Sequence, residues 1–142
     1  MEIRSASSND IEYISHKLSI YFDETNSHFG FPRYKTDIEL MSKVVSERVS
    51  DTQSEYKYLV ALDEDEVVGF INILLSEETP EILVVIGDSI EIKKSLIQEA
   101  LSIFKENGYT FVLGEVGQWD DTKNLIEEFN GEVVQLRYIL KI

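Results

Sequence analysis

The stretch VVIGDSIEIKKSLIQEALSIFKENGY, residues Val84 to Tyr109, decides the fold of this chain. Its β-branched start predicts a buried strand, and after a glycine the apolar residues recur at the spacing of an amphipathic helix. The helical stripe consists of Ile92, Leu96, Ala100 and Phe104. Gly108 is predicted to end the helix as its C′ residue. The order strand, glycine, helix is one that proteins use to present backbone N–H groups to a phosphate.

The composition predicts one folded domain over residues 1–142. Hydrophobic residues make up 43% and aromatic residues 11% of the chain. The net charge of -14 disfavours nucleic acid and anionic membranes and suits cationic amines, although an acidic surface also serves solubility. Without cysteine, and with His16 and His28 lacking ligand spacing, we expect no disulfide and no metal site. The start is neither apolar nor basic and no apolar run reaches about 18 residues, so we expect a cytoplasmic protein.

Working outward from the central helix gives the complete element order. The predicted elements are a strand at 1–6, a helix at 11–22, a loop at 23–34, a helix from 38, a hairpin at 56–75, a strand at 81–86, the helix after 88, a strand at 110–116, a helix at 122–129 and a strand at 132–142. Capping boxes are predicted at Asn9–Glu12, Thr36–Glu39 and Asp88–Glu91. This order predicts an α/β (α+β) fold with a mixed sheet and helices on both faces.

Three segments resemble the GNAT superfamily of acetyl-CoA-dependent N-acetyltransferases. They are LVALDEDEVVGFINILL, SLIQEALSIFKENGYTFVLGEV and TKNLIEEFNGEVVQLRYILKI, and the likeness is strongest from Tyr58 to the end. The resemblance implies a mostly antiparallel sheet in which the strands EILVVI and TFVLGEV run parallel and splay apart. It also implies that the pantetheine arm of acetyl-CoA lies in that gap.

The resemblance further implies a pyrophosphate site at the start of the central helix, but the family's loop motif is degenerate here. Asp88, Ser89, Glu91 and Lys93 stand where the motif has Arg or Gln and glycines. If Asp88 caps the helix as predicted, its carboxylate occupies backbone N–H groups that a pyrophosphate would need. Lys93 and Lys94 either fold over an anion or form a solvated helix face. The implied acetyl-CoA-binding residues are Val84, Val85, Ile86, Gly87, Asp88, Ser89, Ile92, Lys93, Lys94 and Asp120.

The resemblance also implies a general base and a general acid. In the family, a tyrosine on the last helix often protonates the departing thiolate. Its position corresponds to Glu127 or Ile126 here, and neither is a phenol. Glu115 is the first candidate base, because partial burial beside Phe111 and Leu113 would tune it, although a strand-end carboxylate also commonly faces water. The other catalytic candidates are Glu81 as a base and Tyr138 as a replacement acid. The substrate-binding candidates are Asn72, Trp119, Phe29 and Tyr34, each of which also has a plain packing or surface interpretation.

Three hypotheses follow from these residues. The first is an N-acetyltransferase that passes an acetyl group directly to a small-molecule or peptide amine. The second is a GNAT-fold binding or interaction domain without cofactor, which the acidic residues Asp88, Glu91 and Asp120 favour. The third is an unrelated α+β binding protein. A homodimer is among the expected assemblies, and the first hypothesis requires that the gap between the splayed strands is not filled by bulky side chains.

Overall fold

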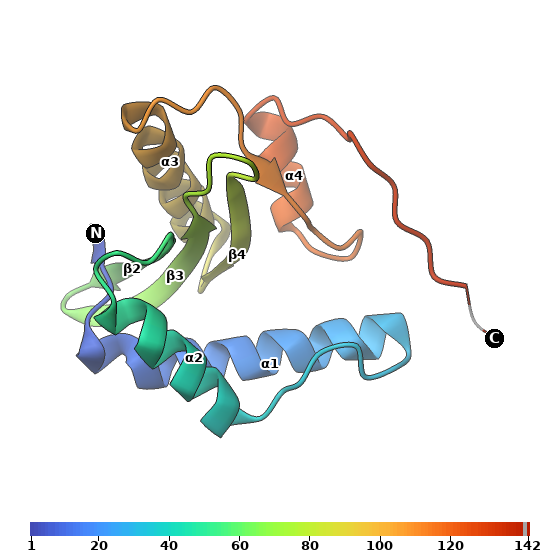
Figure 1. Ribbon diagram of the computed structural model, residues 1–142, viewed down its shortest axis with the longest axis horizontal. Coiled ribbons are helices and arrows are strands. Elements are labelled where there is room, and N and C mark those ends of the chain that lie inside the picture. Colours follow the sequence, from blue (N-terminus) through green and yellow to red (C-terminus); the bar gives the residue numbers. More distant parts are fainter. Residues whose placement is uncertain (141) are drawn as a thin grey trace.

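A computed structural model describes residues 1–140 and 142 and contains one five-stranded sheet (Figure 1). The elements are β1 (Glu2–Ser5), η1 (Ser8–Asp10), α1 (Ile11–Phe29), α2 (Ile38–Ser50), β2 (Tyr56–Asp63), β3 (Glu66–Leu74), β4 (Glu81–Gly87), α3 (Ile90–Glu106), β5 (Leu113–Gly114) and α4 (Thr122–Glu128). The strand order is β1-β2-β3-β4-β5, and only the β4–β5 pair is parallel. The predicted mixed, mostly antiparallel sheet is confirmed.

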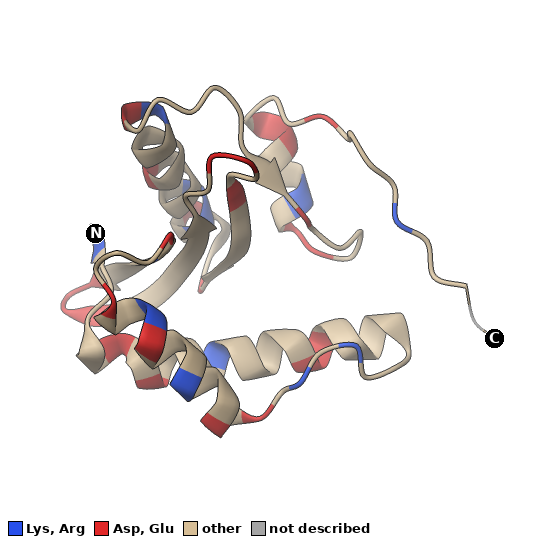
Figure 2. Cartoon of the chain, viewed as in Figure 1, with Lys and Arg blue, Asp and Glu red and all other residues tan. Residues whose placement is uncertain are grey.

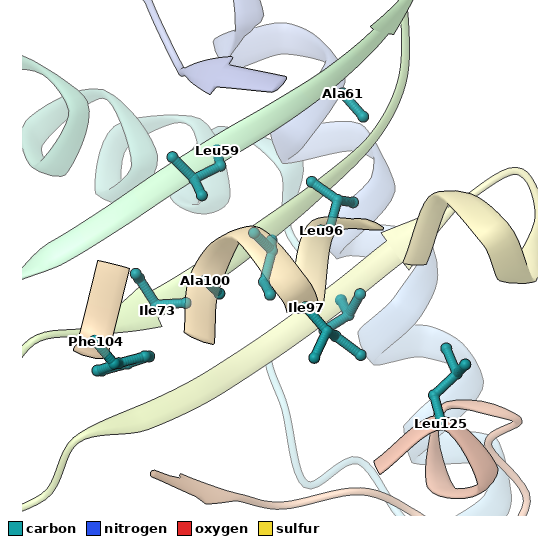
Figure 3. Packing of buried hydrophobic residues seen from close by; sticks show 10 residues of the cluster. Leu59, Ala61, Ile73, Leu96, Ile97, Ala100, Phe104 and Leu125 are labelled. Atoms are coloured by element: carbon teal, nitrogen blue, oxygen red, sulfur yellow. The ribbon is translucent and has the colours of Figure 1, made fainter. Parts of the chain in front are cut away.

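Helices cover both faces of the sheet and divide the core into two clusters. The cluster under α1 and α2 contains Ile14, Leu18, Val45, Val60 and Phe70, among others. The cluster under α3 and α4 contains the residues labelled in Figure 3, which include Leu96, Ala100, Phe104 and Leu125. Because β2 and β3 are covered on both sides, their sequences form almost continuous apolar runs instead of alternating.

The tight turn of the predicted hairpin and the predicted carboxyl end of the central helix are confirmed. Glu64 and Asp65 have φ values of 49° and 66°, the left-handed pair that a two-residue hairpin turn needs. Gly108 follows α3 with φ 85°, and its N–H bonds to the Lys105 carbonyl at 3.0 Å. The Tyr109 N–H closes on the Phe104 carbonyl at 3.0 Å, which completes a Schellman motif.

The first two predicted capping boxes are wrong by one or more residues. Instead of Asn9, Ser7 and Asp10 form the box before α1, and the Asp10 carboxylate accepts the Ser7 N–H at 2.8 Å. Asp37, one residue after Thr36, caps α2 and accepts N–H groups of its first turn. A cap residue must have an extended backbone, so the end of the preceding segment decides which of several adjacent polar residues takes this position.

The predicted loop over residues 23–34 is also wrong, because α1 continues to Phe29. Gly30 ends the helix with φ 76°. The polar residues of this turn have bonding partners that permit a helix. The Thr25 hydroxyl donates to the carbonyl one turn earlier at 2.9 Å, and the Asn26 amide both donates to and accepts from the backbone of Tyr34 at 2.8 Å. These bonds compensate for the low helix propensity of such residues.

Strand pairing near the carboxyl end is much shorter than predicted. The strand predicted over 110–116 is reduced to the two residues of β5. The segment predicted as a final strand over 132–142 pairs with no strand in its described residues, and it runs away from the sheet (Figure 1). Its apolar side chains are exposed, for example Val134 at 80% and Leu140 at 88%. A β-rich sequence becomes a strand only where a partner edge is available, and β5 offers an edge of two residues.

An ion pair between the partly exposed Arg4 and the buried Asp10 ties β1 to the turn before α1. Asp10 is only 2% exposed, and Arg4 donates to its two carboxylate oxygens from Nη1 at 2.7 Å and from Nη2 at 3.2 Å. Burial by itself raises the pKa of Asp10, but the hydrogen bonds from Arg4 and Ser7 outweigh it, so the pKa lies below its ordinary value. A depressed pKa means that the pair stabilises the fold above the unfolded pKa of about 3.9 and that this contribution is lost as pH falls through the folded value.

We therefore expect Asp10→Asn to lower the free energy of unfolding by about 1.5–3 kcal/mol at pH 7, because it removes charged hydrogen bonds. The difference from the natural chain should shrink at pH 3, which lies below the unfolded pKa of about 3.9, so that the unfolded chain gains a proton at this carboxylate. Urea unfolding at both pH values measures this. Glu12→Gln, which neutralises an exposed carboxylate on α1, is the matched control and should change little. An equal loss at both pH values would contradict the electrostatic explanation.

Candidate functional site

The parallel pair β4–β5 separates after two residues. Only Glu81 with Leu113 and Ile82 with Gly114 are in register, after which β4 continues to Gly87 without a strand on this side. The register with β3 also shifts between Ile82 and Val84, so β4 is bulged at this point. A bulge and a missing neighbour both leave backbone groups free for a ligand. The predicted splayed pair is confirmed, which excludes the hypothesis of an unrelated fold in which these strands are not adjacent.

Two cavities flank the splayed strands, so the gap is not filled. The first has a volume of about 140 Å³ and lies mainly among aliphatic side chains of β4, α3 and α4. The second has a volume of about 480 Å³ and lies between α1, the end of β4 and the segment before α4. Tyr21, Val85 and Asp120 line both cavities. These three residues therefore form a wall common to both cavities, which we call the junction.

Several predicted residues line these cavities. Val84, Val85, Glu115 and Asp120 line the first, and Val85, Ile86, Gly87, Lys93, Trp119 and Asp120 line the second. The remaining candidates line neither cavity; they are Asp88, Ser89, Ile92, Lys94, Glu81, Asn72, Phe29, Tyr34 and Tyr138. The structure thus gathers residues of β4, α3 and the segment before α4, which the sequence linked only through the resemblance.

The predicted Asp88 capping box is wrong, because Ser89 caps α3. The Asp88 N–H bonds to the Val68 carbonyl at 3.0 Å, so the chain is still attached to the sheet there. The Ser89 hydroxyl accepts the Ile92 N–H at 3.3 Å. In the part of the chain that the structure describes, the N–H groups of Ile90 and Glu91 have no acceptor, and the helix dipole adds partial positive charge there.

The lysines near this helix start are already paired with carboxylates. The Lys93 Nζ donates to the Asp121 Oδ1 at 2.6 Å and lies 3.9 Å from Asp120. The hydrogen bond from Lys93 holds the pKa of Asp121 below its ordinary value, against a smaller effect of burial. Lys94 lies 3.7 Å from Glu128. Lys93 therefore connects α3 to the segment before α4, with a side chain that is only 15% exposed. Lys94 lies on an exposed helix face, as one of the two alternatives predicted, and pairs there with α4.

The two candidate bases differ in their surroundings. Glu115 has a 54% exposed side chain that lies 3.7 Å from Arg33 and 3.3 Å from Arg137, so the predicted partial burial is wrong. The chain leaves the sheet directly after Gly114, and no neighbouring strand covers this position. Burial first, and the charge of Glu115 second, raise the pKa of Glu81, while Arg137 opposes the shift. The pKa of Glu81 is therefore shifted upward, the direction that favours a carboxylate acting as a base nearer to neutral pH.

Two further candidates, Tyr138 and Asn72, line neither cavity. Tyr138 belongs to the exposed carboxyl-terminal segment and is 78% exposed, so it cannot act as an acid in the gap in this conformation. Asn72 is 4% exposed, which rules out the solvated strand face, and its Oδ1 has no hydrogen-bond partner among the described residues. Its register partner on β4 is Val84.

Trp119 forms one wall of the second cavity by stacking on α1. Its ring lies 4.4 Å from that of His28 in a parallel arrangement and 5.7 Å from that of Phe29 at right angles. Tyr34 stacks on Phe22 at 4.8 Å behind this wall. The three aromatic candidates are therefore each packed against side chains of α1, and only Trp119 of the three lines the cavity.

Sequence reasoning missed Tyr21 and Glu24, which both line the second cavity. Tyr21 stands beside Phe22 in the apolar pattern of α1, where an aromatic residue is ordinarily part of the core. Glu24 lies in the stretch predicted as a loop. No local signal distinguishes either residue, because only the packing of α1 across the end of β4 brings them to the gap.

Other features of the described residues limit the kind of site. No helix in the described ranges has both the length and the apolar character to cross a membrane. Over the same residues, no three His, Asp or Glu side chains gather as metal ligands would. Acidic residues lie on all four helices and on several loops (Figure 2). The site is thus a cleft between strands on an acidic molecule.

Comparisons with known proteins identify this architecture. No protein-family model matches the chain, and no curated protein matches it. Among solved structures, a transcriptional regulator from Bacillus halodurans C-125 is 18% identical with a TM-score of 0.73 and 99% of both chains covered. A ribosomal-protein-alanine N-acetyltransferase from Brucella melitensis biovar Abortus 2308 is 14% identical with a TM-score of 0.68 and full coverage of both chains.

A third similar structure is an aminoglycoside acetyltransferase from an uncultured soil metagenomic sample, in complex with sisomicin. It is 22% identical, with a TM-score of 0.58, and the likeness covers 99% of this chain and 96% of that one. These likenesses extend over the whole chain and agree with the sheet order and the splayed pair described above. The chain therefore has the fold of the GNAT superfamily of acetyltransferases.

Proposed function

We propose that this chain is an N-acetyltransferase that passes an acetyl group directly from acetyl-CoA to an amine. The observation that carries the proposal is the β4–β5 pair, hydrogen-bonded over only two residues of each strand and opening onto an aliphatic cavity. An extended chain such as a pantetheine arm can complete the unpaired edge of β4, much as a peptide adds to a sheet edge. The fold alone would not justify the activity, since one fold hosts many functions.

The residues fit one end of acetyl-CoA better than the other. The aliphatic gap suits the arm, and the free N–H groups of Ile90 and Glu91 are donors for a phosphate oxygen. Asp88 and Glu91 add negative charge beside those donors, and Lys93 is held by Asp121. We therefore expect the affinity to come mainly from the arm, with a smaller contribution from the phosphates.

The chain offers carboxylates for the proton that the amine must lose. Glu81 has a raised pKa and lies on the first residue of β4, and Glu115 lines the first cavity. A base with a pKa nearer to neutrality transfers protons more effectively at physiological pH. In this proposal Glu81 is the preferred base, acting through water, because it does not itself line the cavity.

The second cavity is the proposed binding site of the acceptor. Its volume of about 480 Å³ lies within the range of small-molecule sites. Glu24 and the indole of Trp119 line it, a combination that suits an ammonium group, while Asp120 and Asp121 are paired there with Lys93. The net charge of -14 would also attract a cationic amine. These features support a small-molecule or peptide amine as the acceptor.

Isothermal titration of the chain with acetyl-CoA and with CoA tests the proposal. We expect saturable binding of both, followed by acetylation of a cationic amine such as spermidine or an aminoglycoside, detected by mass spectrometry. The absence of heat up to millimolar acetyl-CoA would end the proposal for this chain acting alone. Binding without transfer to any amine would limit it to the donor site.

A second candidate is a GNAT-fold binding domain without cofactor. The observation in its favour is the Lys93–Asp121 ion pair beside the start of α3. This pair occupies the lysine nearest to the helix start, so the charges that remain there are carboxylates, which repel a phosphate. The similar transcriptional regulator shows that proteins described by a non-catalytic role share this architecture. Density for CoA between β4 and β5 in a crystal grown with excess CoA would contradict this candidate.

A further inference from the structure

The junction of the two cavities contains one side chain that can donate a hydrogen bond at neutral pH. Of the three residues that line both cavities, Val85 is apolar and Asp120 carries a carboxylate. Tyr21, on α1, carries the only O–H group of the three. If the donor lies in the first cavity and the acceptor in the second, these shared residues are the nearest to both, and the acyl transfer would take place beside them.

The chemical state of Tyr21 defines what it can do there. Burial, and after it the negative charge of Asp120, raise the pKa of Tyr21 to about 12. The phenol is therefore neutral at physiological pH. An ordinary thiol has a pKa of about 8.5, so this phenol is too weak an acid to protonate a departing thiolate fully. It remains well suited to donate a hydrogen bond to a developing oxyanion, whose basicity is far higher.

We propose that the Tyr21 hydroxyl donates a hydrogen bond to the acyl oxygen at the junction of the two cavities. This inference rests on the proposed function, and the role it assigns to Tyr21 is that of a hydrogen-bond donor to the acyl oxygen, distinct from the acid role of the family's tyrosine on the last helix. No sequence motif marks the residue, and the assignment comes from the cavities alone.

The acyl transfer that Tyr21 would assist begins with attack of the amine on the thioester carbonyl. The amine lone pair forms the new C–N bond, and the carbonyl π electrons move onto the acyl oxygen, which Tyr21 stabilises. Return of these electrons re-forms the carbonyl and breaks the C–S bond, and the sulfur leaves with the electron pair. The nitrogen loses one proton to the base and the sulfur gains one from water, so Tyr21 keeps its own proton throughout. Donors aimed at such an oxyanion are among the largest contributions to acyl transfer.

The test compares Tyr21→Phe with Tyr13→Phe, the same substitution two turns earlier on α1. The Tyr13 hydroxyl is buried without a hydrogen-bond partner among the described residues, and Tyr13 lines neither cavity. Removing it should leave activity unchanged and preserve or raise the melting temperature. For Tyr21→Phe we expect kcat to fall about 10²–10³-fold with little change in KM, equally from pH 6 to pH 9.

A binding experiment gives a readout that does not depend on turnover. A ketone analogue of acetyl-CoA, with a methylene between sulfur and carbonyl, keeps the oxygen that Tyr21 would contact. We expect the natural chain to bind this analogue about two- to twelvefold more tightly than the analogue in which the carbonyl is replaced by methylene. Tyr21→Phe should abolish this preference and leave the affinity for CoA unchanged.

The outcomes separate this inference from the proposed function. If the natural chain binds no CoA, both fail. If it binds CoA and acetylates an amine, but Tyr21→Phe retains kcat within about threefold or keeps the preference for the carbonyl, only the role of Tyr21 is overturned. An equal loss in Tyr21→Phe and Tyr13→Phe would show a general effect on α1 and would also overturn the role.

Discussion

Replacing Phe104 with alanine is expected to lower the free energy of unfolding by about 3–5 kcal/mol. Phe104 is 1% exposed, lies on the buried stripe of α3, and packs edge to face against Tyr109 with ring centroids 5.5 Å apart. The substitution removes the apolar contacts of a large ring. It also leaves a cavity, because close-packed neighbours relax only partly into the empty space. Thermal unfolding should show a melting temperature lower by roughly 10 to 20 °C.

Phe111→Ala provides the matched control for this prediction. Phe111 lies just beyond α3 on the way to β5 and is 54% exposed, so its removal creates no buried cavity. We expect a change within about 0.5 kcal/mol. Equal destabilisation by the two substitutions would show that the core between α3 and the sheet is not packed as described.

Replacing Gly114 with leucine is expected to block the proposed donor site. Gly114 is the last residue of β5 and lines the first cavity. A Cβ added there would lie 3.9 Å from the Ile82 carbonyl oxygen and 4.0 Å from the Ile126 Cδ1, so the backbone tolerates a side chain. Ile82 and Ile126 also line the first cavity, so we expect the remaining leucine atoms to occupy part of it. We expect the affinity for CoA to fall by more than about a hundredfold, equivalent to about 2.8 kcal/mol.

Gly114→Ala is the control that distinguishes filling of the cavity from the mere absence of a glycine at this position. Its single methyl group sits at ordinary van der Waals distances, and we expect its affinity for CoA to remain within about threefold of that of the natural chain. Titration calorimetry measures the affinities, and thermal unfolding verifies that both variants are folded. If the leucine variant binds CoA like the natural chain, the arm does not lie between β4 and β5.

The elements that the sequence predicted well are those with a long, unambiguous hydrophobic period. The stripe from Ile92 to Phe104 predicted α3, and the acidic turn at Glu64 and Asp65 predicted the hairpin, because each signal is contained in a few adjacent residues. Helix starts were less predictable. Ser89 and Asp88 are both good caps, and the choice between them depends on the bond from the Asp88 N–H to Val68 of a different strand.

The candidate site was predicted in its location but not in its contacts. The resemblance directed attention to β4 and to the segment before α4, and the cavities lie there. The exposure of Glu115 and the pairing of Lys93 with Asp121 were not predictable, since each depends on where a distant segment ends. Tyr21 was missed for the same reason, because its distance from β4 in the sequence hides their contact.

From the sequence alone, the central helix, the hairpin and the strand before the helix could be recognised, as could the negative charge beside the glycine-containing turn. Hydrophobic period and turn residues act over a few neighbours, so they can be recognised without the fold. The tertiary structure alone decided that β4 and β5 separate after two residues, that the resulting gap stays open, and that α1 brings a phenol to its junction. These features arise from contacts between residues far apart in the chain, and such contacts depend on how the helices pack across the sheet.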